Sequence, residues 1–335
     1  MKLNYDVERM NERLHRHITR EEFFALALAF GMVGMFIWLE PKLSFAYFDF
    51  RIYLGTAYGK FSYQDFYFYY GYWLLPIFAF LTKLPLNLAY GLWCSINILG
   101  IFFAVRLFGG KPLIALASYQ MFYSLIYGNI TGLIVGGLAL CWWGLVSRKW
   151  HIAGLGIALA SAKYQIGLTG SLLLLLAAAE LSWKDRVRVM VVPILIWIAS
   201  LVIYPGWPLQ ALDILVNHPP NALGSISLWR WFGPWALLFC LPPLFLRLEP
   251  QRRFIALVAV MGLAFPYFQQ GDLLFLLVMP IGWIGLLGNL GYLMALYGWT
   301  ALQWLAILPL TVYILALKPG LSSLFKVSLD QRKVT

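Results

Sequence analysis

The feature that most constrains this chain is the repeated occurrence of long apolar runs. Only 12% of its 335 residues are charged and 61% are hydrophobic, whereas a soluble domain carries about 25% charged residues. A crossing of the bilayer needs ~20 predominantly apolar residues in a helix. The pattern therefore predicts an all-α, polytopic integral membrane protein with about 9–12 transmembrane or re-entrant helices.

Several of the expected helices are shorter than a full crossing, which favours re-entrant hairpins or helices broken around a polar cavity. The region 72–107 and the last segment each fit one crossing or two half-crossings. The segments fall at about 23–39, 72–82, 86–107, 113–127, 130–147, 151–162, 166–181, 187–203, 229–246, 252–268, 272–287 and 291–316.

Positive charges predict the orientation, because loops on the cytoplasmic side collect Lys and Arg. Basic clusters occur in the N-terminal tail, around Arg106, at Arg148 and Lys149, around Arg186 and around Arg252. We expect a cytoplasmic tail over 1–22, a single transmembrane domain over 23–317 and a C-terminal tail over 318–335. The loops at about 40–71 and 204–228 are then expected outside.

The same argument narrows the possible partners. The formal net charge is +11, but we assign it to cytoplasmic loops facing the lipid bilayer and predict no nucleic-acid partner. The three cysteines lie in apolar segments without metal-ligand spacing. Phosphate-binding, dinucleotide-binding and HExxH motifs are missing from the sequence. We therefore predict neither a metal site nor a cofactor.

Five polar residues from separate stretches are predicted to meet on the outer side: Asp49, Asn129, Lys163, His218 and Asp272. Asp49 is flanked by two phenylalanines, and partial desolvation among aromatic rings would raise its pKa and make it a better base. In an extended stretch the side chain of Arg51 would lie on the same face as that of Asp49. A plain salt bridge between Asp49 and Arg51 is therefore the competing interpretation.

The other four residues have both a functional and a structural interpretation. Lys163 interrupts an apolar pair of segments, where a cation suits a phosphate or simply extends to the interface. His218 could bind a phosphate or be an ordinary loop histidine. Asn129, in "YGNITG", could bind a sugar hydroxyl, and Asp272 could orient an acceptor or cap the next helix.

Four stretches together resemble glycosyltransferase family 87, over roughly residues 20–250. They are "FDFRIYLGTAYG", "YYGYWLLPIFAFLTKLPLNLAYGLWCSINILGIFFAVRLF", "YGNITGLIVGGLALCWWGLVSRK" and "GIALASAKYQIGLTGSLLLLL". The chain departs from the family pattern at three places. It has the single proline Pro76 where a double proline is common, Asn129 in place of glutamine, and no proline after Lys163.

The resemblance implies a C-type membrane glycosyltransferase fold and transfer of a sugar, mannose in that family, from a polyprenyl-phosphate donor. The acceptor would be a hydroxyl of a glycolipid, polysaccharide or protein, and the anomeric configuration would invert. Asp49 would be the catalytic base. Lys163, Arg51 and His218 would bind the donor phosphate, and Asn129, Tyr53, Gln165 and Asp272 would bind sugar or acceptor.

Two other functions fit a membrane protein of this composition. A transporter or flippase of lipid-linked sugars would show inverted repeats and polar sites near the bilayer midplane. We find no internal symmetry in the sequence, and the polar residues gather at one face. A noncatalytic membrane subunit would explain the departures from the family pattern.

Overall fold

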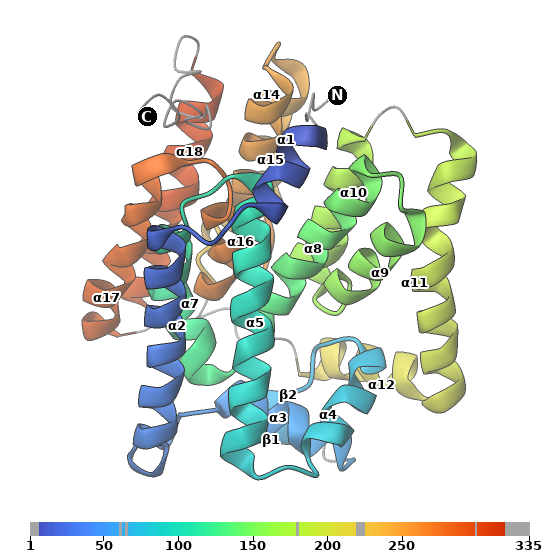
Figure 1. Cartoon of the computed structure of the whole chain (residues 1–335), viewed down its shortest axis with the longest axis vertical. Helices are drawn as coiled ribbons and strands as arrows, with labels where there is room; N and C mark the ends of the chain where they lie inside the picture. Colours follow the sequence, from blue (N-terminus) through green and yellow to red (C-terminus); the bar gives the residue numbers. More distant parts are fainter. Residues whose placement is uncertain are drawn as a thin grey trace.

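The computed structural model describes residues 7–59, 62–63, 66–178, 181–218, 225–298 and 300–318. Within these residues the chain is almost entirely helical, with one small antiparallel hairpin formed by β1 (Ser62–Tyr63) and β2 (Phe66–Tyr67). The helices lie side by side along the long axis of the molecule (Figure 1). The predicted all-α, polytopic membrane class is confirmed.

Three described helices are long and apolar enough to cross a membrane: α2 (Arg20–Leu39, with η1, Glu40–Lys42), α5 (Leu86–Phe108) and α11 (Trp183–Ile203). A fourth span is possible if α7 (Tyr119–Tyr127) and α8 (Thr131–Val146) count as one, although they bend by 115° at the break between them. This break lies in the "YGNITG" stretch that contains Asn129, between the expected segments 113–127 and 130–147.

Shorter helices form the rest of the chain up to residue 217. Those within 72–81, 112–116 and 150–177 fall in expected apolar segments, whereas those at 7–15, 48–57 and 207–217 form where a tail and two loops were expected. The expected segments 151–162 and 166–181 are a helix, a π-helical turn and a second helix. These elements are α1 (Val7–His15), α3 (Phe48–Ala57), η2 (Tyr72–Leu74), α4 (Leu75–Leu81), α6 (Pro112–Leu116), α9 (Trp150–Ala160), η3 (Tyr164–Leu168), α10 (Thr169–Ala177) and α12 (Trp207–Asn217).

The second half is more broken than the apolar runs suggested, because prolines and glycines interrupt the helices. Only α15 and α18 are regular α-helices of more than ten residues there. The elements are α13 (Trp229–Phe232), η5 (Gly233–Cys240), α14 (Leu241–Phe245), α15 (Pro250–Ala264), η6 (Gln270–Leu273), α16 (Leu274–Leu277), η7 (Gly282–Asn289), α17 (Leu290–Met294), η8 (Ala295–Tyr297), η9 (Ala301–Ala306) and α18 (Ile307–Leu317).

Helices α5 and α8 approach each other closely through glycines. A Cβ on Gly100 would lie 2.4 Å from the carbonyl oxygen of Gly132, and one on Gly136 would lie 2.7 Å from the Cα of Gly100. Small residues permit this contact between apolar helices. Because α8 begins directly after the 128–130 turn, the close packing also determines where that turn lies.

Polar groups of α5 hold the same turn. The Trp93 indole N–H donates to the Gly128 carbonyl at 2.8 Å, and the Tyr90 hydroxyl donates to the Leu125 carbonyl at 2.6 Å. The Asn97 side-chain oxygen accepts from the backbone N–H of Leu133 at 2.9 Å, near the start of α8. The turn is therefore fixed to the end of a long helix by side chains that are themselves buried.

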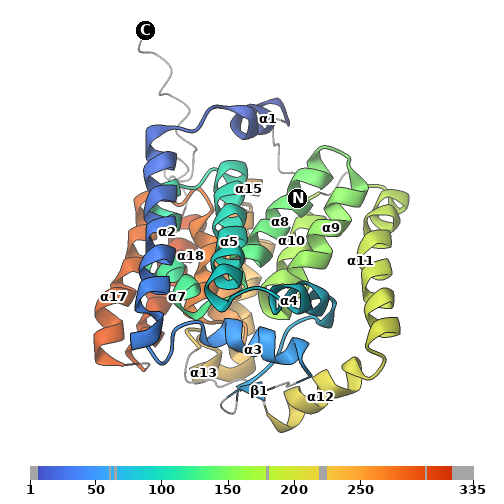
Figure 2. The same ribbon diagram turned by 60° about the horizontal axis from the view of Figure 1, so that its bottom comes forward.

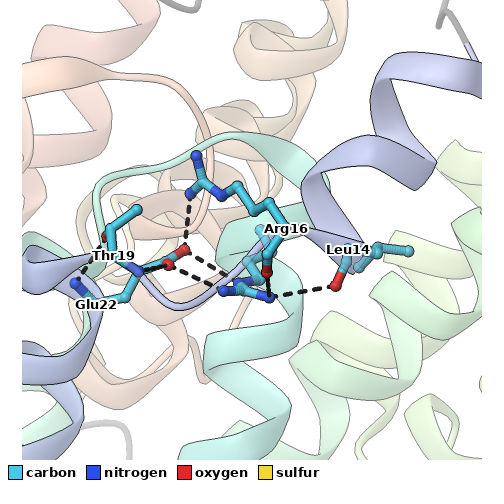
Figure 3. Close-up of polar contacts among 5 residues, drawn as sticks. Leu14, Arg16, Thr19 and Glu22 are labelled. Atoms are coloured by element: carbon cyan, nitrogen blue, oxygen red, sulfur yellow. Dashed lines mark hydrogen bonds and ion pairs between the residues drawn. The ribbon is translucent and has the colours of Figure 1, made fainter.

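The two ends of the molecule differ. Helices α3, α4 and α12 and the hairpin lie at one end, and α1 and α14 lie at the other (Figure 1). At the α1 end, buried Glu22 receives bonds from Arg106 at 3.0 and 3.1 Å and from Arg16 at 2.7 Å (Figure 3). Arg106 also donates to the Leu14 and Arg16 carbonyls. This cluster joins α1, α2 and α5.

Candidate active site

Asp49 lies in the first turn of α3, which is a helix and not the extended stretch that we expected. The start of α3 is attached to the end of α7, because the Tyr47 backbone N–H donates to the Ile126 carbonyl at 2.8 Å. Phe50 packs over Gly128, where a Cβ would come within 2.7 Å of the phenylalanine Cβ. Gly128 also has φ +67°, a conformation that favours glycine. These contacts bring Asp49 to the 128–130 turn.

Asn129 holds the Asp49 carboxylate. Its Nδ2 donates to Asp49 Oδ2 at 2.6 Å, and its Oδ1 accepts from the backbone N–H of Thr131 at 3.0 Å. A backbone N–H can only donate, so it fixes which side of the Asn129 amide faces Asp49. Among the described residues, no hydrogen bond reaches Asp49 Oδ1. The half-buried carboxylate is thus held by one oxygen with the other left available.

Lys163 and Asp272 form a buried ion pair next to this bond. Asp272 Oδ2 also accepts from the backbone N–H of Gln269 at 3.1 Å, so Asp272 caps η6 as one interpretation predicted. An ammonium group has three donors, and its pairing with one carboxylate leaves further donors for a second anion. A phosphate could therefore bind Lys163 without displacing Asp272.

Thr131 connects the two pairs. Its Oγ1 lies 2.7 Å from Asn129 Oδ1 and 3.2 Å from Asp272 Oδ1. Both neighbours are acceptors, and a hydroxyl carries one hydrogen, so it can donate to one of them at a time. The contacts run without interruption from Asp49 through Asn129, Thr131 and Asp272 to Lys163. The sequence analysis did not select Thr131, although it stands two residues after Asn129.

The surroundings of Asp49 suit a base. Burial, the largest effect, raises its pKa to about 6, while the bond from Asn129 and the charge of Lys163 act to lower it and Asp272 acts to raise it. A carboxyl group with this pKa is largely ionised at neutral pH and still accepts a proton more readily than an ordinary aspartate. The predicted upward shift of the Asp49 pKa thus agrees with the structure.

Tyrosines around Asp49 were missed in the sequence. Burial and the nearby Asp49 charge raise the pKa of the Tyr70 hydroxyl, which also contacts the Asn129 side chain. Tyr123 and Tyr127 interact electrostatically with Asp49, and their rings lie 4.7 Å apart. Their spacing of four residues just before the Gly128–Asn129 turn places them on one side of α7. This four-residue spacing is the sequence pattern from which the two tyrosines could have been identified.

Three other candidates, Arg51, His218 and Tyr53, have their described contacts outside this chain of residues. Arg51 pairs with Glu40 at 2.5 Å, which replaces the salt bridge with Asp49 that was the competing interpretation. Exposed His218 stacks on Tyr67 with ring centroids 4.1 Å apart. Tyr53 is buried in an aromatic cluster with Phe78 and Trp93. The side chain of Gln165 lies outside the described residues.

The donor groups for a metal ion do not gather in this region. In the parts of the chain that the structure describes, no three His, Cys, Asp or Glu residues are close enough to hold a metal together.

One comparison with known proteins bears on this site. Residues 68–213 match the model of glycosyltransferase family 87, while no curated protein and no solved structure matches the chain. The matched region includes Asn129, Thr131 and Lys163, with Asp49 before it and Asp272 after it. The match agrees with the resemblance found in the sequence: residues 68–213 of this membrane protein are similar to glycosyltransferase family 87, which supports a glycosyltransferase.

Proposed function

We propose that the protein transfers a sugar, mannose as the family resemblance implies, from a polyprenyl-phosphate donor to an acceptor hydroxyl. One observation carries the proposal. Asp49 is half-buried, held through one oxygen by Asn129, and linked by Thr131 and Asp272 to the buried cation of Lys163. A carboxylate and a cation in one chain of contacts support this proposal, because displacement at a sugar phosphate requires a base and a group that binds the phosphate.

The proposed step is a single displacement. The free Oδ1 of Asp49 takes the proton of the acceptor hydroxyl while the hydroxyl oxygen forms a bond to the anomeric carbon. The bond between that carbon and the phosphate oxygen breaks, and its electron pair stays on the phosphate. Lys163 offsets the charge that develops there. The configuration inverts because the attack comes from the side opposite the leaving group.

The other candidates take secondary parts in this proposal. Asn129 acts first on Asp49, to which its Nδ2 donates, and Asp272 acts first on Lys163, with which it forms the ion pair. Tyr70 replaces Tyr53 as the aromatic group beside the sugar, because Tyr53 is fully buried. Arg51, paired with Glu40, would act from outside the chain of contacts. His218, at the exposed end of α12, would reach only the rim of the site.

The proposed site faces the outside of the membrane. Basic residues near the ends of α1, α8 and α5 lie at the opposite end of the molecule from α3 (Figure 1). Loops rich in Lys and Arg stay in the cytoplasm. The donor would therefore be delivered in the outer leaflet, with its isoprenoid chain in the lipid and its phosphate at the interface. The acceptor would then be a glycolipid, a polysaccharide or a protein of the cell envelope.

The proposal is tested with purified protein, radiolabelled polyprenyl-phosphate-mannose and a total lipid extract of the host. We expect the wild type to transfer the label and Asp49→Asn to lose transfer by at least about a hundredfold, as expected for loss of a general base. Asp213→Asn is the matched control, because Asp213 is an exposed acid in α12 at the same end of the molecule.

Each outcome has a defined meaning. Transfer that Asp49→Asn leaves intact contradicts the assignment of the base. A wild type that moves labelled donor between leaflets without forming a product contradicts the transferase and favours the flippase alternative. Size-exclusion profiles of both variants establish that they fold.

A further inference from the structure

Helix α12 exposes an apolar surface that no described part of the chain covers. Leu209, Leu212 and Val216 are 75%, 58% and 67% exposed. With 100° between successive residues, these three side chains lie within one third of the helix circumference. A polar strip of Gln210, Asp213 and Asn217 borders them. We name the first set, Leu209, Leu212 and Val216, the apolar face of α12.

The opposite side of α12 packs on the protein. Ile214 is buried, and Trp207 stacks on Tyr72 with ring centroids 5.4 Å apart and lies 6.0 Å from the ring of Trp73. The orientation of the helix about its own axis is therefore determined, and the apolar face cannot turn inward without breaking these contacts. A water-soluble surface would not carry three large apolar side chains in a row beside a polar strip.

The position of α12 in the chain identifies what covers it. The helix follows α11, a candidate membrane span, after only three residues, Tyr204 to Gly206. Side chains along α11, such as Ile194, Ile198 and Val202, are also exposed, so its apolar surface faces lipid. Helix α12 bends away from the lower end of α11 and runs along the end that carries α3 (Figure 2). The apolar face of α12 thus continues a lipid-facing surface at the level where the span ends.

We propose that α12 lies in the lipid–water interface at the end of the molecule that carries Asp49, with its apolar face among the acyl chains. Its polar strip then faces water or headgroups. The proposal concerns the surface of the protein and rests on the proposed function only in calling this end the active-site end.

The interface helix is joined to the site by direct contacts. The Tyr69 hydroxyl donates to the His218 carbonyl at 2.6 Å, and the His218 ring stacks on Tyr67. The next residue along, Tyr70, interacts with Asp49 and Asn129. The depth of α12 in the membrane therefore sets the height of the 66–73 segment, and with it the height at which a lipid-linked phosphate meets Lys163.

The test is a pair of spin labels at neighbouring positions. Cys240 is replaced by serine, since Cys94 and Cys141 are buried, and Leu212→Cys and Asp213→Cys are made one at a time and labelled. The full chain is reconstituted in vesicles of phosphatidylcholine and phosphatidylglycerol. Collision rates are measured with oxygen, which concentrates in lipid, and with a water-soluble nickel chelate.

We expect the ratio of oxygen to nickel collisions to be several-fold higher at position 212 than at position 213. Equal ratios with high nickel access at both positions would place the apolar face in water and overturn the proposal. If the label at position 212 is protected from both reagents and its spectrum shows dipolar broadening between labels, a second copy of the chain covers the apolar face. That result would also overturn the proposal. The measurement needs no activity, so it stands independently of the proposed transfer reaction.

Discussion

At the residue scale, the site depends on how one amide is oriented. Asn129 would be free to present either side of its amide to Asp49 if Thr131 did not fix its oxygen. Because the N–H side faces the carboxylate, the bond stabilises the ionised form of Asp49 against the cost of burial. The balance between these two effects sets the pH at which the base works.

The first prediction concerns this balance. Asn129→Leu removes the hydrogen bond that lowers the pKa of Asp49, so the pKa should rise from about 6 by about one to two units, since a bond to a charged group contributes about 1.5–3 kcal/mol. A base must be ionised to act, so the acid limb of kcat/KM against pH should move to higher pH. Thr131→Ser, which keeps the hydroxyl, is the control. An unmoved midpoint in Asn129→Leu would contradict this role.

The second prediction concerns the buried ion pair. Lys163→Met leaves Asp272 buried without its cation, and loss of one partner of a buried pair costs about 3–5 kcal/mol. The double variant Lys163→Met/Asp272→Leu should recover most of that stability, because it leaves no uncompensated charge. Thermal unfolding in detergent micelles measures both. If the losses in free energy of unfolding from the two substitutions simply add in the double variant, the ion pair contributes little to stability.

At the element scale, the helices that carry the site are determined by close packing. The 128–130 turn sits where α8 begins, and α8 contacts α5 through Gly100, Gly132 and Gly136. The periodicity of apolar residues predicts such helices but not the distance between them. A glycine in an apolar run can mark a turn, a kink or a close contact between helices.

The third prediction tests this packing. Gly100→Ala should destabilise the protein by about 1–3 kcal/mol, a cost typical of overpacking, and lower transfer by moving Asn129 away from Asp49. Gly34→Ala is the matched control in another apolar helix, because a Cβ there meets nothing within 4 Å. That control should be neutral or slightly stabilising, as alanine is the better helix former. Thermal unfolding and transfer are measured on both, and equal effects would exclude a role for the contact.

At the scale of the whole molecule, the two ends carry different chemistry. The end with α1 holds the cluster of Glu22, Arg16 and Arg106, and the other end holds Asp49 (Figures 1 and 3). Helix α2 runs the full length between them, so its two ends should lie on opposite sides of the membrane.

The fourth prediction follows from this arrangement. In the Cys240→Ser background, Lys42→Cys should react with a membrane-impermeant maleimide in intact cells. His17→Cys should react only after the cells are permeabilised. Both positions are exposed in the structure, so differences in labelling report the side of the membrane. The reverse pattern would turn the proposed site toward the cytoplasm.

The sequence by itself determined the class of the protein and the positions of most long apolar helices up to residue 203, and it singled out Asp49, Asn129, Lys163 and Asp272 as candidate site residues. It could do so because a bilayer demands long apolar helices and makes each intramembrane charge conspicuous. The broken helices after residue 228 were less predictable, since short 3₁₀ and α segments share the same apolar composition.

Only the tertiary structure decided which of those residues act together. It joined Asp49 to Asn129 and Lys163 to Asp272, turned Arg51 toward Glu40, and added Thr131 and Tyr70, which the sequence did not single out. The physical reason is that hydrogen bonds and ion pairs act over a few ångströms and have strict directions, while residues such as Lys163 and Asp272 are separated by more than a hundred positions along the chain. Proximity of that kind arises from packing, which local sequence patterns do not record.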